Sequence, residues 1–131
     1  MKSQNLFIPL LFLPLFSPAA VVFTDSHHPP QHADNHQVVY LDAPEQLQAQ
    51  FFGTLPADPA EAERVVKAGM QSSSWLTMQQ QLMQAYQGVL KAYSLKLTKY
   101  PAVVSDDHHV VYGTADVAVA EQLLAEFREA R

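Results

Sequence analysis

The sequence predicts a single α/β domain, in which helices pack on a small mixed sheet of about four strands. The chain has 131 residues, of which 48% are hydrophobic, and a chain of this size forms one hydrophobic core rather than two. The predicted elements follow one another as strand, strand, helices, strand, strand and helix. No internal repeat interrupts this order, so we expect one folding unit.

Residues 1–20 have the three parts of a secretory signal peptide. These are a short N-region with Lys2, the apolar run Leu6 to Phe16, and the small residues Ser17, Ala19 and Ala20. The apolar run is about half the roughly 20 residues that a membrane-spanning helix needs, and Pro9 and Pro14 interrupt it as a core helix. We therefore expect cleavage after Ala19 or Ala20, with residues 21–131 as the mature domain.

Two short runs rich in β-branched residues predict the first two strands, at Val21–Thr24 and Val38–Leu41. The segment between them, Ser26 to Gln37, contains prolines, Asp34 and Asn35, a composition typical of a loop. Its eleven or so residues leave little room for a helix. The direction in which the two strands pair therefore remains open at this stage.

Three helices are predicted in the middle of the chain. Asp42 is placed to cap the first, which ends near Gly53. Asp58, Pro59 and Glu61 form a stronger start signal for the second, and the polar segment Gln71 to Ser74 separates it from the third. The third is the most regular, because apolar residues recur at helical spacing in the list Trp75, Met78, Leu82, Tyr86, Val89, Leu90 and Tyr93.

The last third of the chain predicts two strands and a helix. The strand-like runs Pro101–Val104 and His109–Tyr112 flank the turn residues Asp106 and Asp107. Gly113 follows the second strand, and Thr114 or Asp116 can cap a final helix.

The charge distribution argues against direct nucleic-acid binding. The formal net charge is −5, and eight basic residues are scattered rather than clustered, whereas a nucleic-acid footprint needs grouped Lys and Arg. The chain contains no cysteine. It therefore has no thiol of its own for disulfide chemistry, and a redox role would depend on the thiols of a partner.

Several segments together resemble a known family. In order along the chain they are Val22-Phe23-Thr24-Asp25, Leu41-Asp42-Ala43-Pro44, Leu55-Pro56-Ala57-Asp58-Pro59, Ala85-Tyr86-Gln87-Gly88-Val89, Lys99-Tyr100-Pro101-Ala102-Val103-Val104 and Val110-Val111-Tyr112-Gly113. They resemble the thioredoxin-like proteins of integrating conjugative elements, which are small exported accessory proteins. The helix, proline, hairpin, glycine and helix of the last third also resemble the closing half of the thioredoxin fold.

This resemblance implies a thioredoxin-like fold and a periplasmic accessory protein of a type IV secretion-like DNA transfer system in a Gram-negative bacterium. Its partners would be other proteins of the conjugative apparatus, with homo-oligomerisation left open. It also implies a cis peptide bond between Tyr100 and Pro101. One departure is clear, because Ser26-His27-His28-Pro29 stands where a Cys-x-x-Cys pair would be expected.

The histidines of the first loop suggest an alternative function. His27, His28, His32 and His36 lie within ten residues, and imidazoles bind zinc, copper or nickel. Prolines in this segment disfavour a helix that would align them, so a solvated loop is the simpler interpretation. A periplasmic metal-binding protein is therefore the alternative, and we assign no metal ligand and no cofactor.

Asp25 and Asp42 follow the first two predicted strands, where α/β enzymes often place acid or base groups. No nucleophile or phosphate-binding loop accompanies them, and turn formation or capping explains both. We therefore expect a protein that is not an enzyme.

Thr98, Lys99, Tyr100 and Pro101 form the candidate peptide-binding segment. In thioredoxin-like proteins, the backbone before the cis-proline pairs with an extended peptide, and this pairing requires no cysteine. The resemblance therefore implies that Thr98 to Pro101 lies at the surface beside the loop that begins at Asp25.

Overall fold

The computed structural model describes residues 20–106 and 108–130. Except for Ala20, the predicted signal peptide lies outside the described residues, as does Asp107 of the predicted turn. Among the helices that the structure describes, none combines the length and the apolar character needed to cross a membrane.

The core of the fold is a four-stranded mixed sheet, as predicted. Its strands are β1 (Val21–Thr24), β2 (Gln37–Tyr40), β3 (Ala102–Ser105) and β4 (His109–Tyr112). The strand order is β2-β1-β3-β4, with β1 parallel to β2 and antiparallel to β3, and β3 antiparallel to β4. The pairing direction that the sequence left open is therefore parallel, and β2 and β4 are the edge strands.

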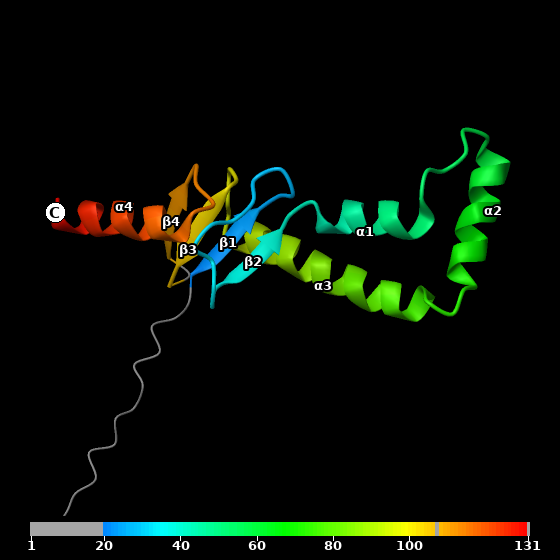
Figure 1. Cartoon of the computed structure of the whole chain (residues 1–131), viewed down its shortest axis with the longest axis horizontal. Coiled ribbons are helices and arrows are strands. Elements are labelled where there is room, and N and C mark those ends of the chain that lie inside the picture. The colour runs from blue at the N-terminus through cyan, green and yellow to red at the C-terminus, as the bar shows by residue number, and fades with distance from the viewer. Residues whose placement is uncertain (1–19, 107, 131) are drawn as a thin grey trace, which may run out of the picture.

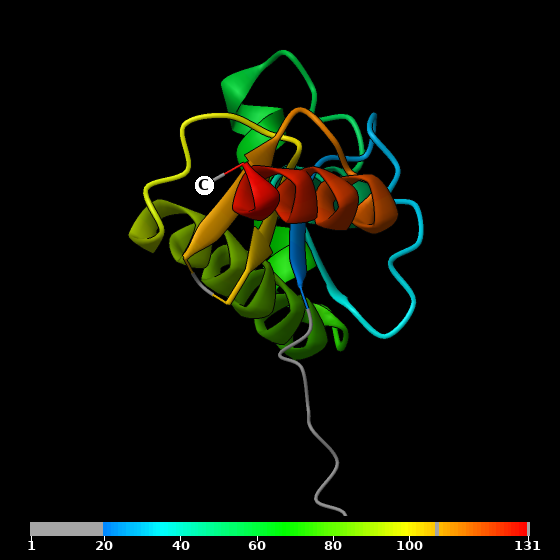
Figure 2. The same ribbon diagram turned by 90° about the vertical axis from the view of Figure 1, so that its left-hand side faces the viewer.

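Alternate residues of each strand point to opposite faces of the sheet, and each face has its own apolar cluster. On one face, Val22 and Val103 pack with Val117 and Ala120 of α4 (Val117–Glu129). On the other, Phe23, Val39 and Val104 pack with Ala92 of α3 (Trp75–Ser94). One helix therefore covers each face of the sheet, as Figure 2 shows.

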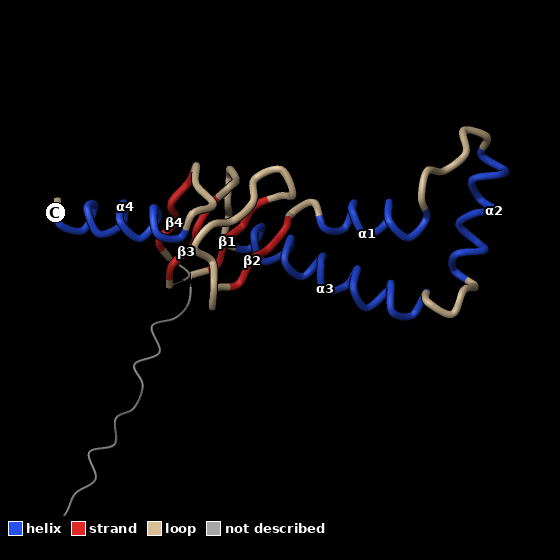
Figure 3. The backbone as a smooth tube through the Cα atoms, in the orientation of Figure 1, coloured by secondary structure: helices blue, strands red, loops and turns tan. Residues whose placement is uncertain are grey.

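Three helices connect β2 to β3: α1 (Ala43–Phe52), α2 (Pro59–Met70) and α3. Helices α1 and α3 lie side by side and extend away from the sheet, and α2 crosses their far ends (Figures 1 and 3). At the tip, the rings of Phe51 and Phe52 have their centroids 5.6 and 6.1 Å from that of Trp75. We call α1, α2 and the first half of α3 (residues 43–84) the helical arm, and the sheet with α4 the sheet body.

The caps differ in one respect from the sequence prediction. The side chains of Asp58 and Asp116 accept hydrogen bonds from backbone N–H groups at the starts of α2 and α4, as a helix cap does. Asp42 occupies the cap position of α1 but makes no capping hydrogen bond. Its carboxylate binds Ser26 instead.

The connection from β1 to β2 is a loop rather than the helix usual between parallel strands. It packs against the start of α4, where the backbone N–H of Gln31 donates to the carbonyl of Ala115 and the N–H of Val117 donates to the carbonyl of Gln31, at 3.1 and 3.0 Å. Ala33 packs against the α4-side cluster. The loop and α4 therefore cover this face of the sheet together.

Candidate functional site

Two carboxylates lie at the carboxyl ends of the parallel strands, and each has a partner. Oδ1 of Asp25 lies 2.6 Å from Nδ1 of His28 and accepts the backbone N–H of His27 at 2.9 Å. The hydrogen bond to His28 holds the pKa of Asp25 below its usual value of 3.8, and burial partly opposes this shift. Asp25 therefore fixes the turn that follows β1.

Asp42 holds the same turn from the other strand. The hydroxyl of Ser26 donates to Oδ2 of Asp42 at 2.5 Å, and the backbone N–H of Ser26 donates to both carboxylate oxygens at 3.1 and 3.2 Å. These bonds from Ser26 lower the pKa of Asp42. Because the hydroxyl donates to a carboxylate and the nearby histidine pairs with Asp25, these groups do not form a serine, histidine and aspartate relay.

The histidines of the first loop do not share a common set of contacts. His28 pairs with Asp25, whereas Nδ1 of His32 lies 2.9 Å from Oδ1 of Asp116 at the start of α4. Nδ1 of His36 is buried and has no hydrogen-bond partner. Within residues 20–106 and 108–130, no three His, Cys, Asp or Glu residues are grouped so that they could hold a metal ion.

The segment Thr98 to Pro101 connects the end of α3 to β3. Helix α3 ends with Lys96 in the left-handed region, at a φ of 56°, and the N–H of Leu97 donates back to the carbonyl of Ala92, as in a Schellman motif. The Tyr100–Pro101 peptide bond is cis, as expected.

Tyr100 is 55% exposed. The register pairs Phe23 with Ala102, so continuing it by one residue sets Pro101 opposite Thr24, next to Asp25. The segment is thus accessible beside the first loop. Whether it binds a peptide remains a prediction.

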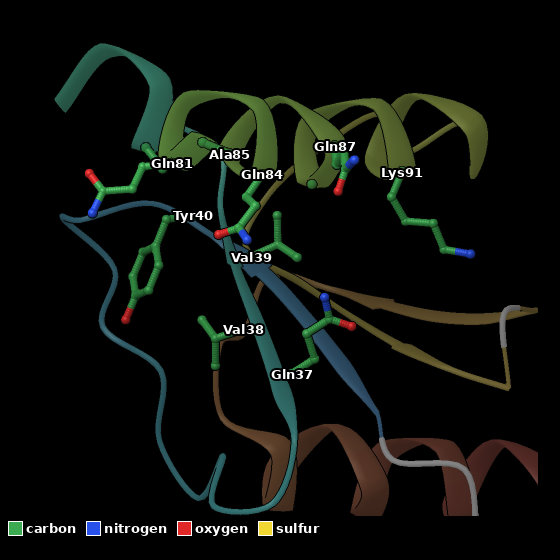
Figure 4. Close-up of a pocket in the computed structure, with 11 residues that line it drawn as sticks. Gln37, Val38, Val39, Tyr40, Gln81, Gln84, Ala85, Gln87 and Lys91 are labelled. Carbon is green, nitrogen blue, oxygen red and sulfur yellow. The ribbon is translucent and has the colours of Figure 1, made fainter. Parts of the chain in front are cut away.

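A groove that the sequence did not reveal runs between edge strand β2 and α3 (Figure 4). Its volume is about 630 Å³. Its walls are lined by Gln37, Val38, Val39, Tyr40, Ala43, Gln81, Gln84, Ala85, Gln87, Gly88 and Lys91. Helix α3 and β2 approach closely at one point, where a Cβ on Gly88 would lie only 2.7 Å from Cγ1 of Val39.

The backbone of β2 faces this groove with groups available for pairing. The N–H of Leu41 donates to the carbonyl of Thr24 on β1 at 2.8 Å. Because backbone groups alternate along a strand, those of Val38 and Tyr40 point away from β1. No described strand lies on that side, so the two residues present N–H and C=O groups of the kind that pair with an added strand.

The opposite wall of the groove is a row of side-chain amides. Gln81, Gln84 and Gln87 recur every third residue on α3, and each amide both donates and accepts hydrogen bonds. This spacing was the sequence signal for the groove. It could not be used without knowing that β2 lies beside α3.

Comparison with known proteins gives one match. No curated protein and no solved structure matches the chain. The profile of a family described as "Protein of unknown function (DUF1525)" matches residues 17–130. Because the match spans most of the sequence, the chain belongs to this DUF1525 family.

Proposed function

We propose that this chain is a non-catalytic interaction protein that binds an extended segment of a partner protein along the groove between β2 and α3. The observation that carries the proposal is the unpaired outer edge of β2 opposite a row of glutamine amides. An added strand would gain main-chain hydrogen bonds from Val38 and Tyr40. The amides of α3 would satisfy its remaining polar groups.

We also propose that the polar cluster at the ends of β1 and β2 does not catalyse a reaction. At the carboxyl ends of β1 and β2, the Ser26 hydroxyl donates to Asp42 and the His28 ring pairs with Asp25. These contacts join the first loop to the strand ends. They support a structural role for the cluster.

The proposed setting is the periplasmic part of a conjugative DNA transfer apparatus, with the partner among its proteins. Support comes from the resemblance to integrating conjugative element proteins and from the predicted signal peptide at residues 1–20. The Thr98 to Pro101 segment is a second candidate surface for the same partner class. Its support is the exposure of Tyr100 beside the first loop.

Photo-crosslinking in donor cells tests the groove directly. A photoreactive phenylalanine analogue at Gln84, which lines the groove, should form a covalent adduct with a protein of the transfer apparatus, identified by mass spectrometry. The same analogue at the exposed Gln122 of α4 is the control. Equal adducts at both positions, or none at Gln84, would contradict the proposal. The recovered protein should lie in the periplasmic fraction and begin at Ala20 or Val21.

Complementation of a deletion strain tests whether strand pairing matters. Tyr40→Pro removes one outward N–H of β2 without touching the ladder to β1, and it should lower transfer frequency by at least about tenfold, the equivalent of about 1.4 kcal/mol of binding. Tyr40→Thr keeps the N–H and should complement fully. If Tyr40→Pro complements and Tyr100→Ala does not, binding belongs to the Thr98 to Pro101 segment instead. Thermal melting followed by circular dichroism checks that each variant folds.

A further inference from the structure

Helix α3 carries an exposed apolar stripe on its outer side, beside the face that packs on α1 and the sheet. At the edge of the stripe, the Tyr86 hydroxyl accepts a hydrogen bond from Nε2 of Gln48 on α1 at 3.5 Å. Its members are Leu76, Met83, Tyr86, Leu90 and Tyr93, with exposed fractions of 65%, 64%, 47%, 63% and 83%. Residues on the inner side are buried, as Met78 and Ala92 show. In Figures 1 and 2, no described element covers the outer side of α3.

The spacing of the stripe is that of a helix-pairing surface. Leu76, Met83 and Leu90 are seven residues apart, and Tyr86 and Tyr93 each follow one of these positions by three residues. Apolar residues alternating at intervals of three and four are the pattern by which two helices pack along a shared seam. The same spacing has one further position between Leu76 and Met83, and the polar residue Gln79 occupies it.

The charge on α3 differs from that of α2 and α4. Lys91 is the only charged residue among the 20 residues of α3. By contrast, α2 and α4 carry Glu61, Glu63, Arg64, Lys67, Glu121, Glu126, Arg128 and Glu129. The centre of a protein interface is depleted in charge and enriched in Tyr and Met, which describes α3 but not α2 or α4. Helix α1 also carries a single charged residue, Glu45.

We propose that a second copy of this chain covers the stripe, with two α3 helices packed antiparallel about a two-fold axis between Gln84 and Ala85. This axis sets Met83 against Tyr86 of the other copy, Leu76 against its Tyr93 and Leu90 against its Gln79. In the first two pairs, a large side chain meets a smaller one. A chain with a net charge of −5 repels its copies. The nearly uncharged surface of α3 is where two copies meet at the least electrostatic cost.

The shape of the molecule favours the antiparallel arrangement. The sheet body sits at the carboxyl end of α3, and the arm tip sits at its amino end (Figure 1). In a parallel pair, the two sheet bodies would compete for the same space. In an antiparallel pair, each sheet body lies beside the arm tip of the other copy.

If fully buried, the stripe would be comparable in size to one side of a specific interface. The five side chains together expose an area on the order of the roughly 800 Å² that each partner contributes to a standard interface. The glutamine row that lines the β2 groove lies on another side of α3. This inference therefore does not depend on the proposed function.

Sedimentation equilibrium over a range of protein concentrations tests the proposal. The protein is purified from expression of the full chain, and its single-chain mass is measured in the same sample. A mass approaching twice that of the chain is expected. Met83→Lys should weaken self-association at least about tenfold, because it places like charges near each other in the seam. Leu123→Lys also replaces an apolar side chain by lysine, but on α4, outside the stripe. It is the matched control and should leave the measured mass unchanged.

A charge-exchange variant tests the direction of pairing. In the antiparallel arrangement, adding Tyr86→Glu to Met83→Lys brings opposite charges together across the axis, so association should recover by at least about tenfold. A parallel pair would instead set each changed residue against its own copy and would not recover. A wild-type protein that stays monomeric at all concentrations would overturn the proposal. That result would leave the stripe to a helix of another protein.

Discussion

The sheet body and the helical arm bury their apolar residues to very different extents. In the sheet body, Val22, Phe23 and Ala102 have no exposed surface. In the arm, Met78 is the most buried apolar side chain of α3 at 4%, and α2 has no buried residue. The arm nevertheless carries large apolar side chains, among them Met70, Leu76 and Met83, which are about half exposed or more.

This difference separates residues that stabilise the fold from residues available to partners. Apolar side chains that remain exposed contribute little to folding and can still be buried on association. We therefore infer that the free energy of folding resides mainly in the sheet body. The proposed groove and the proposed dimer surface both lie on the long helix α3, where apolar side chains remain exposed.

The largest expected effect comes from emptying the core of the sheet body. Phe23→Ala removes a fully buried ring and should lower the free energy of unfolding by about 3–5 kcal/mol. Phe52→Ala removes a half-buried ring at the arm tip and should cost no more than about 1–2 kcal/mol. Chemical denaturation followed by circular dichroism, at one protein concentration, measures both.

If Phe23→Ala does not fold, Phe23→Leu gives the same comparison on a smaller scale, at about 1–1.5 kcal/mol. Equal losses at the two sites would contradict the division between sheet body and arm.

A smaller effect compares two glycines in helices. A Cβ on Gly88 would lie 2.7 Å from Cγ1 of Val39, a buried side chain of the sheet that cannot easily move. Gly88→Ala should therefore destabilise the protein by about 1–2 kcal/mol, because crowding exceeds the gain in helix propensity. At Gly69 the nearest atoms belong to the Phe52 and Phe51 rings, at 2.9 and 3.1 Å.

Because those rings are only half buried, they can shift. The free energy of unfolding of Gly69→Ala should therefore lie within about 0.5 kcal/mol of that of the wild type. Thermal and chemical unfolding of the two variants side by side tests this pair. A more damaging change at Gly69 than at Gly88 would show that the arm tip is packed more tightly than the junction with the sheet.

The smallest effect is on the acid dependence of stability. The hydrogen bond with His32, and the capped N–H groups of α4, hold the pKa of Asp116 below its usual value of 3.8, against the opposing effect of burial. A lowered carboxyl pKa contributes stability that is present above about pH 3.8 and is lost as the pH falls through the lower folded value.

Asp116→Asn should therefore melt at a lower temperature than the wild type at pH 6. The two melting temperatures should approach each other toward pH 2. Asp25 and Asp42, whose pKa values are also lowered, act in the same direction. A constant difference between the two proteins across this range would mean that the carboxylate does not contribute through its charge.

Local sequence patterns predicted most of the elements but not their mutual placement. Periodicity located α3, and Asp58 with Pro59 located the start of α2, because these signals lie within one element. The role of Asp42 was wrong as a side-chain cap, since its partner Ser26 is 16 residues away and is brought near by the parallel pairing of β1 and β2. The β2 groove was missed for the same reason, because it requires β2 and α3 to lie side by side.

The aromatic cluster at the arm tip gives the chain a built-in optical reporter. Trp75 is the only tryptophan in the sequence, and its ring lies against Phe51 and Phe52, far along the arm from the sheet. Its fluorescence therefore senses the tip alone, whereas circular dichroism averages over every helix and strand. Local opening of the tip is thus spectroscopically separable from unfolding of the whole chain, without any added label.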